Sequence, residues 1–136
     1  MKLLKHANVY TPAPLGKRDV LIEGERILRI AEEITGYDEL PDVDVYDLSG
    51  KTLVPAYIDL HVHITGGGGE QGPASRVPES SLSTFFKNGI TTVVGLLGTD
   101  GITRSLENLV AKARALTEEG MTVYTLTSVS YTHLRA

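Results

Sequence analysis

The sequence contains no cysteine. It can therefore form neither a disulfide framework nor a thiolate metal site, which fits a reducing compartment. No apolar run approaches the roughly 20 residues that a membrane helix needs. Near the N-terminus, Lys5, His6 and Asn8 interrupt what would be the apolar core of a signal peptide. We therefore expect a cytoplasmic protein with no membrane partner.

Positive charge is also scarce. The formal net charge is −4, and the Lys and Arg residues are scattered rather than gathered in a stripe. This disfavours a nucleic-acid partner or an anionic membrane surface. The hydrophobic content of 41% and charged content of 22% are typical of a globular protein. The length of 136 residues suits one domain or parts of two.

Residues 1–54 have the pattern of a small β domain. Two β-rich runs, 20–22 and 27–30, flank a short polar segment in which Gly24 can supply the positive φ of a hairpin turn. Valines alternate with aspartates over 42–46, which indicates a further half-buried strand.

The pattern changes after Pro55. Residues 56–63 are mostly apolar, as expected of a strand buried on both faces. The segments that follow alternate in type: a helix over 78–88, a strand over 90–97, a helix over 105–119 and a strand over 121–127. This β-α-β-α-β order predicts right-handed crossovers and a parallel sheet.

Helix end signals support these assignments. Pro78 is the expected first residue of the shorter helix and Gly89 its stop. Ser105 is the expected cap of the longer helix. A complete (β/α)₈ barrel needs about 250 residues. We therefore predict an α/β chain in which residues 55–127 form the start, about three strands, of a partial (β/α)₈ TIM barrel.

Two histidines mark the end of the first predicted barrel strand. His61 and His63 are two residues apart, so both side chains point the same way from a strand. Neutral imidazoles so placed can bind one metal ion. Asp59 shares their face and could orient a ligand. The alternative is a chance pair, but chemistry gathers at the carboxyl ends of parallel strands, which favours the metal.

Four glycines and a carboxylate follow. Gly66–Gly69 could form a flexible surface loop or a loop whose backbone approaches a ligand. A phosphate ligand is disfavoured because no Lys or Arg follows and Glu70 would repel it. We expect instead a buried or half-buried Glu70 that pairs with an ammonium group of a substrate.

Two other polar residues lie near these motifs. Thr99 follows the second barrel strand, and contact with a substrate and an ordinary turn are equally favoured for it. Arg76 is expected to be a solvated lone charge, and His6 to lie on the surface.

Residues 54–63 resemble the first barrel strand of the amidohydrolase superfamily, although that family usually has Gly-Phe in place of Ala56-Tyr57. Such enzymes pair a split β-sandwich with a (β/α)₈ barrel that holds one or two metal ions. Within the superfamily, the chain is most similar to isoaspartyl (β-aspartyl) dipeptidases, over most of residues 1–127. The segments that carry this resemblance are 66–73, 93–100 and 113–120.

The resemblance implies a β-sandwich part over 1–54 and roles for six residues. His61 and His63 would bind the more buried of two zinc ions. A small dipeptide substrate would contact Gly68, Gly69, Glu70 and Thr99, with Glu70 holding its free α-amino group. Zinc-bound hydroxide would attack the side-chain amide carbonyl of a β-aspartyl dipeptide.

The rest of the family's machinery has no counterpart in this chain. It comprises a carboxylated lysine that bridges the zinc ions, two further histidines and an aspartate base. We therefore assign no catalytic residue within the chain, and we expect the full-length parent to be a homo-oligomer. Residues 128–136 depart from the family pattern. They contain His133, and Ser130 stands where the family has a substrate-contacting tyrosine. We predict that they are a non-family tail.

Two alternatives remain open. One is another amidohydrolase, either a cyclic amidase of the dihydroorotase or hydantoinase type or an acylamino-acid deacylase, for which Glu70 has no amine to bind. The other is that the chain alone is inactive. Three barrel strands leave an open edge and an uncovered apolar face, and two histidines are fewer than the three protein ligands of most catalytic zinc sites.

Overall fold

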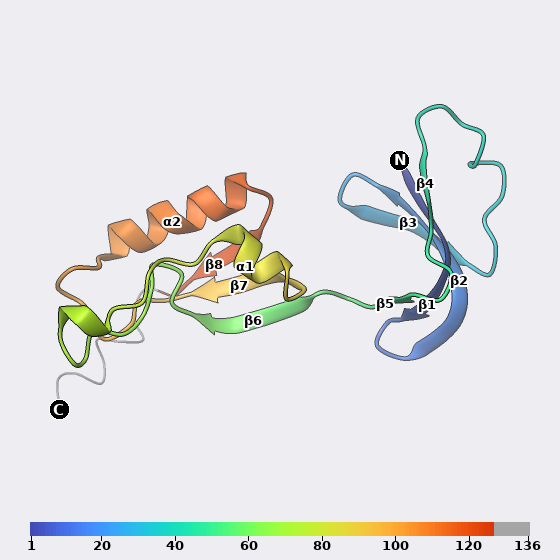
Figure 1. The fold of residues 1–136 in the computed structure, drawn as a ribbon. Coiled ribbons are helices and arrows are strands. Elements are labelled where there is room, and N and C mark those ends of the chain that lie inside the picture. The colour runs from blue at the N-terminus through green and yellow to red at the C-terminus, as the bar shows by residue number, and fades with distance from the viewer. Residues whose placement is uncertain (127–136) are drawn as a thin grey trace. The chain divides into compact units, whose positions relative to one another are not determined.

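The chain folds into two compact units, the first spanning Met1–Pro55 and the second beginning at Ala56. The computed structural model describes residues 1–126 (Figure 1). The predicted tail over 128–136, with His133, lies outside the described residues. Among residues 1–126, no helix has both the length and the apolar character needed to cross a bilayer.

The first unit is a five-stranded mixed sheet. The strands follow the order β3-β2-β1-β4, and β5 also pairs with β1. The β1–β2 and β2–β3 pairs are antiparallel, whereas β4 and β5 run parallel to β1. The bounds are β1 Lys2–Tyr10, β2 Pro14–Glu23, β3 Arg26–Ala31, β4 Asp44–Asp47 and β5 Thr52–Leu53.

The predicted hairpin is confirmed, with Gly24 at φ 54° between β2 and β3. The strand near residues 43–46 is also present as β4, but the predicted half-burial of this strand is wrong. Val45 and Tyr46 are 42% and 45% exposed, because β4 is an outer strand of the sheet. Only the preceding Val43 packs against a buried cluster.

β1 has no clear sequence signal, because polar residues break its alternation. The structure shows why it tolerates them. The register of β1 against β2 shifts near His6, which adopts φ 62°. The carboxylate of Asp19, 1% exposed, accepts the backbone N–H of His6 at 2.8 Å and that of Ile34 at 2.9 Å. A buried carboxylate thus satisfies donors that an irregular strand leaves free. The His6 side chain is 42% exposed, as expected.

The second unit contains a three-stranded parallel sheet in the order β6-β7-β8, with α2 along one face (Figure 1). The predicted β-α-β-α-β order and parallel pairing are confirmed. The bounds are β6 Tyr57–Val62, η1 Pro73–Ser75, α1 Leu82–Phe86, β7 Ile90–Gly95, α2 Leu106–Glu118 and β8 Thr122–Thr125.

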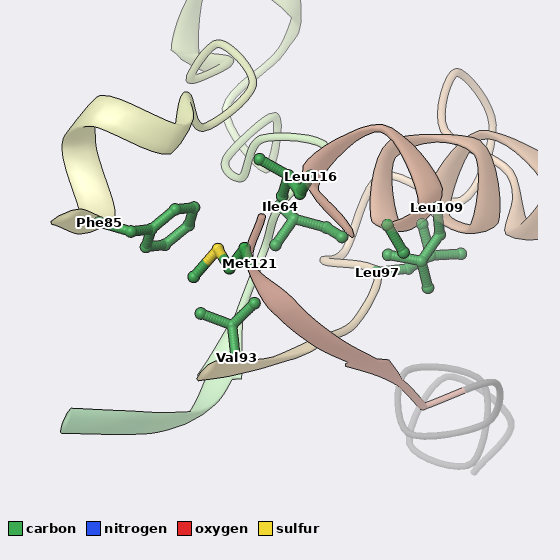
Figure 2. Close-up of a cluster of buried hydrophobic side chains, with 8 residues drawn as sticks. Ile64, Phe85, Val93, Leu97, Leu109, Leu116 and Met121 are labelled. Atoms are coloured by element: carbon green, nitrogen blue, oxygen red, sulfur yellow. The ribbon is translucent and has the colours of Figure 1, made fainter. Parts of the chain in front are cut away.

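The core of this unit lies between the sheet and the helices. Figure 2 shows apolar side chains from α1, β7, α2 and the loops converging on one cluster. α2 contributes Leu109, Ala113 and Leu116, whose spacing forms one helical stripe. Its ends follow the sequence signals. Ser105 Oγ accepts Asn108 N–H at 3.2 Å, and Gly120 adopts φ 102° after the last turn.

Two predictions for this unit are wrong in detail. β6 is not buried on both faces, since Ile58 and Leu60 are 63% and 69% exposed. β6 is an edge strand with β7 as its neighbour in this sheet, so part of its apolar surface has nothing to cover it within the described chain. The shorter helix begins after Ser81 rather than at Pro78. The preceding Val77 donates its N–H to Gly67 O at 2.9 Å, and this pairing draws the segment away from a helix.

Replacement of a core side chain should weaken this unit. Leu109 is 0% exposed, so Leu109→Ala leaves a cavity and should lower the free energy of unfolding by about 2–5 kcal/mol. Leu106→Ala, one turn away at a 36% exposed position, should cost clearly less. Urea denaturation of the intact protein measures both. Equal costs would show that the stripe is not the buried face of α2.

Candidate metal and substrate site

The two predicted metal ligands lie together at the carboxyl end of β6. The rings of His61 and His63 are edge to face, with centroids 5.3 Å apart. His63 Nδ1 lies 3.3 Å from the carbonyl oxygen of Leu96, after β7. A carbonyl can only accept a hydrogen bond, so Nδ1 carries the proton and Nε2 keeps its lone pair. This contact favours the neutral tautomer in which Nε2 could bind a metal.

The remaining neighbours keep this pair in place. A Cβ on Gly67 or Gly98 would lie 3.5 Å from the His63 ring, in ordinary van der Waals contact, so both glycines lie beside the ring. Asp59 Oδ1 accepts the backbone N–H of His61 at 3.1 Å. Asp59 thus bonds the backbone at His61, and its suggested role in orienting a ligand stays a prediction.

The histidines fit part of a zinc site. Within residues 1–126, no three or more His, Cys, Asp or Glu side chains gather as a metal cluster. Catalytic zinc usually takes three protein ligands. His61 and His63 can therefore contribute two ligands to such a site.

The glycine loop is tightly packed. Gly66 and Gly68 adopt φ 90° and 68°. A Cβ on Gly66 would lie 2.2 Å from Val77 O, and one on Gly68 would lie 2.3 Å from Ser75 O. Neither position can accept a side chain without moving the backbone. These two glycines let the segment before Glu70 lie directly against the segment that returns toward α1.

Glu70 and Thr99 meet across the loops that follow β6 and β7. Thr99 Oγ1 donates to Glu70 Oε1 at 2.6 Å. This hydroxyl, followed by the backbone N–H of Glu70 itself, lowers the pKa of the Glu70 carboxyl. The Glu70 side chain is exposed, so the predicted burial is wrong for this chain. The roles of Gly68, Gly69, Glu70 and Thr99 in contacting a substrate stay predictions.

Asp100 has several hydrogen-bond and ion-pair partners that the sequence did not indicate. Its carboxylate accepts the Thr103 hydroxyl and the backbone N–H groups of Thr103 and Ile102, at 2.9 and 3.2 Å. Arg76 Nε and Arg104 Nη1 lie 3.4 and 3.6 Å away. The donors of Thr103 and Ile102, above all the Thr103 hydroxyl, together with the charge of Arg76, lower the pKa of Asp100 to about 2. Arg76 is exposed, as predicted, but it is not a lone charge, because it pairs with Asp100.

Arg104 is a site residue that the sequence did not reveal. It is 3% exposed, and its guanidinium donates to three backbone carbonyls, those of Thr65, Gly68 and Val77. A single arginine in a loop has no distinctive pattern. The only available signal was the opposite charge of Asp100 four residues earlier.

Solved structures of other proteins are similar to this chain in sequence and fold. No protein-family model matches the chain. The β-aspartyl dipeptidase of Fervidobacterium islandicum AW-1, solved in complex with a β-Asp-Leu dipeptide, is 47% identical to it with a TM-score of 0.85. The match covers 91% of this chain and 32% of that one. The chain is similar to β-aspartyl dipeptidases. The resemblance predicted from the histidine pair and the glycine loop is thus confirmed.

Less similar proteins also match most of this chain. A dihydroorotase of Staphylococcus aureus Mu50 is 32% identical over 111 residues, which are 82% of this chain and 25% of that protein. D-Hydantoinase from Thermus sp., at 23% identity and a TM-score of 0.63, matches 96% of this chain and 28% of its own. The partial (β/α)₈ barrel is confirmed. The chain spans about a third or less of the length of each of these relatives.

Glycine at position 66 should be indispensable. Gly66→Ala places a methyl group on Val77 O in addition to straining a positive φ. Gly72→Ala is the matched control, because Gly72 has φ 98° but open space where its Cβ would stand. Gly66→Ala should lower the free energy of unfolding by at least about 2 kcal/mol more than the control. Urea denaturation measures the difference, and equal losses would contradict the close packing.

The two acidic groups should respond to separate hydroxyls. Thr99→Val removes the main donor to Glu70, so the pKa of Glu70 should rise while that of Asp100 stays at about 2. Thr103→Val should raise the pKa of Asp100 and leave that of Glu70 unchanged. Carboxyl-carbon NMR titration of the intact protein follows both groups. A Glu70 pKa unaffected by Thr99→Val would mean that the hydrogen bond is not formed in solution.

Proposed function

We propose that this chain is part of a zinc-dependent dipeptidase that hydrolyses β-aspartyl (isoaspartyl) dipeptides. The observation that carries the proposal is the exposed carboxylate of Glu70, bonded to Thr99 on the same rim as the His61–His63 pair. The 47% identity to a protein solved with a β-Asp-Leu dipeptide supports this substrate class.

His61 and His63 would hold zinc through their neutral imidazoles. The hydrogen bond from His63 Nδ1 to Leu96 O supports this role, since it leaves Nε2 free to bind a metal. Bound zinc would supply a Lewis acid for the scissile carbonyl and would activate the attacking water. The chain's own contribution is to orient the two rings. The bridging lysine, two histidines and the aspartate base would come from the rest of the full-length protein, with two zinc ions per site.

Glu70 would select substrates with a free α-amino group. Its lowered pKa keeps the carboxylate charged at neutral pH, where the amine of a dipeptide is largely protonated. A charge-assisted hydrogen bond to that amine is stronger than a neutral one. The pairing is present above the pKa of Glu70 and is lost as pH falls through it. Gly68, Gly69 and Thr99 would line the same binding surface.

A cyclic amidase is the second candidate function, and the dihydroorotase relative at 32% identity favours it. Such substrates lack a free α-amino group, so Glu70 would add nothing to their binding. Hydrolysis of cyclic amides in preference to β-aspartyl dipeptides would therefore favour this alternative.

We expect the 136-residue chain alone to be inactive. It supplies two metal ligands within its described part, and apolar side chains on the open sheet remain exposed, among them Ile58, Leu60 and Tyr124. Homo-oligomerisation of the full-length parent and a cytoplasmic location stay predictions. So does the assignment of residues 1–54 to a β-sandwich domain.

Removal of the Glu70 charge tests the proposal. Glu70→Gln in the intact enzyme should raise KM for a β-aspartyl dipeptide and lower kcat/KM by about 10- to 100-fold, the value of one charge-assisted bond of roughly 1.5–3 kcal/mol. Zinc content should stay unchanged, because Glu70 is not a ligand. Steady-state kinetics and metal analysis measure the two effects.

Glu118→Gln, at an exposed position on α2, is the matched control and should change neither quantity. Loss of zinc in Glu70→Gln, or unaltered kinetics, would remove Glu70 from the proposed role.

A further inference from the structure

We propose that Arg104 is a positioning residue that holds the glycine loop in place and thereby aims the Glu70 carboxylate. The proposal deepens the proposed function and rests on it for its kinetic consequences. The structural part, that one buried guanidinium fixes the conformation of the loop, stands on the contacts of Arg104 alone.

The first observation is the set of atoms that Arg104 binds. Its Nε donates to Thr65 O at 2.9 Å, its Nη2 to Val77 O at 3.0 Å and its Nη1 to Gly68 O at 3.4 Å. Thr65 and Gly68 belong to the part of the loop that leads away from His63, and Val77 belongs to the part that returns toward α1. One planar guanidinium therefore connects the outgoing and the returning parts of the loop. Its rigid arrangement of five N–H donors makes this possible.

The second observation is that the four glycines bring no side chains of their own to hold the loop. Four consecutive glycines give the backbone a large conformational freedom, and they carry no side chains that could pack. The backbone bonds between the outgoing and the returning parts of the loop include Val77 N–H to Gly67 O and the bridge between Gly68 and Arg76. The three charge-assisted bonds of Arg104 add to these backbone bonds at the same place.

The third observation links this arrangement to Glu70. Asp100 forms ion pairs with Arg104 and Arg76 and accepts three hydrogen bonds from the turn that precedes α2. Thr99, the neighbour of Asp100, donates to Glu70. The loop after β7 thus holds the glycine loop through Arg104 and holds the carboxylate through Thr99. Loss of the Arg104 contacts should therefore disturb the hydrogen bond between Thr99 and Glu70.

Lysine cannot replace this arginine. An ammonium is a compact point charge and cannot reach three separated carbonyls at once, although it preserves the charge near Asp100. Arg104→Lys therefore tests the geometry of the fork, and Arg104→Met tests the fork and the charge together. Arg114, exposed on α2, offers matched control substitutions to Lys and to Met.

The first experiment does not depend on enzymatic activity. Amide hydrogen exchange of the intact protein should be faster by about tenfold or more over residues 65–77 in Arg104→Lys, while α2 and β7 keep their wild-type rates. Both Arg114 variants should match the wild type throughout. Unchanged exchange over 65–77 would overturn the proposal. So would an equal increase over the whole second unit in Arg104→Lys, since that would make Arg104 a residue of general stability.

The second experiment measures the consequence for Glu70. With a β-aspartyl dipeptide, Arg104→Lys should raise KM by about 10- to 100-fold, as expected when a binding group is displaced by about 1 Å, with a smaller change in kcat and unaltered zinc content. In a Glu70→Gln background the same substitution should change KM much less, because the carboxylate that it positions is gone.

The outcomes are distinguishable. A wild-type enzyme without dipeptidase activity would overturn the proposed function, and the exchange experiment would still decide whether Arg104 holds the loop. Full additivity of Arg104→Lys and Glu70→Gln, with faster loop exchange, would refute the link to Glu70.

Discussion

Parallel pairing of β6 with β7 is the constraint on which the candidate site depends. It brings the two carboxyl ends to one edge of the sheet, where Leu96 N–H bonds to Val62 O at 2.9 Å and Leu96 O faces His63 Nδ1. The same pairing brings Thr99 to Glu70, 29 residues earlier in the chain. Without this pairing, the His61–His63 pair and the Glu70 carboxylate would not be held at the same edge of the sheet.

Local signals predicted most of the fold of the second unit. Ser105 and Gly120 mark the ends of α2 because capping depends on neighbouring residues alone. The His61–His63 pair was recognisable for a similar reason, since a spacing of two on a strand gives a common direction. The exposure of β6 could not be predicted, because burial of an edge strand depends on what lies beside it rather than on its own sequence.

The contacts of Arg104 show where sequence reasoning fails. Its carbonyl partners lie 27 to 39 residues away and belong to the backbone, so no pattern of side chains announces them. Asp100 directly follows Thr99 in the sequence, yet its ion pairs depend on how two loops pack. The prediction for Glu70 failed in part for the same reason. Its acidity and its place after the glycines were evident, but its exposure follows from the path of the loop.

The two carboxylates of the site differ in what remains available to a ligand. Asp100 accepts a hydroxyl and two backbone N–H groups and lies beside two guanidinium groups, so its charge is already compensated within the protein. The Glu70 carboxylate is exposed, and the bonds that lower its pKa come chiefly from one hydroxyl and its own backbone N–H. Neither donor carries a formal charge. The negative charge of Glu70 therefore remains available to a cationic group, as the proposed pairing with a substrate amine requires, whereas that of Asp100 does not.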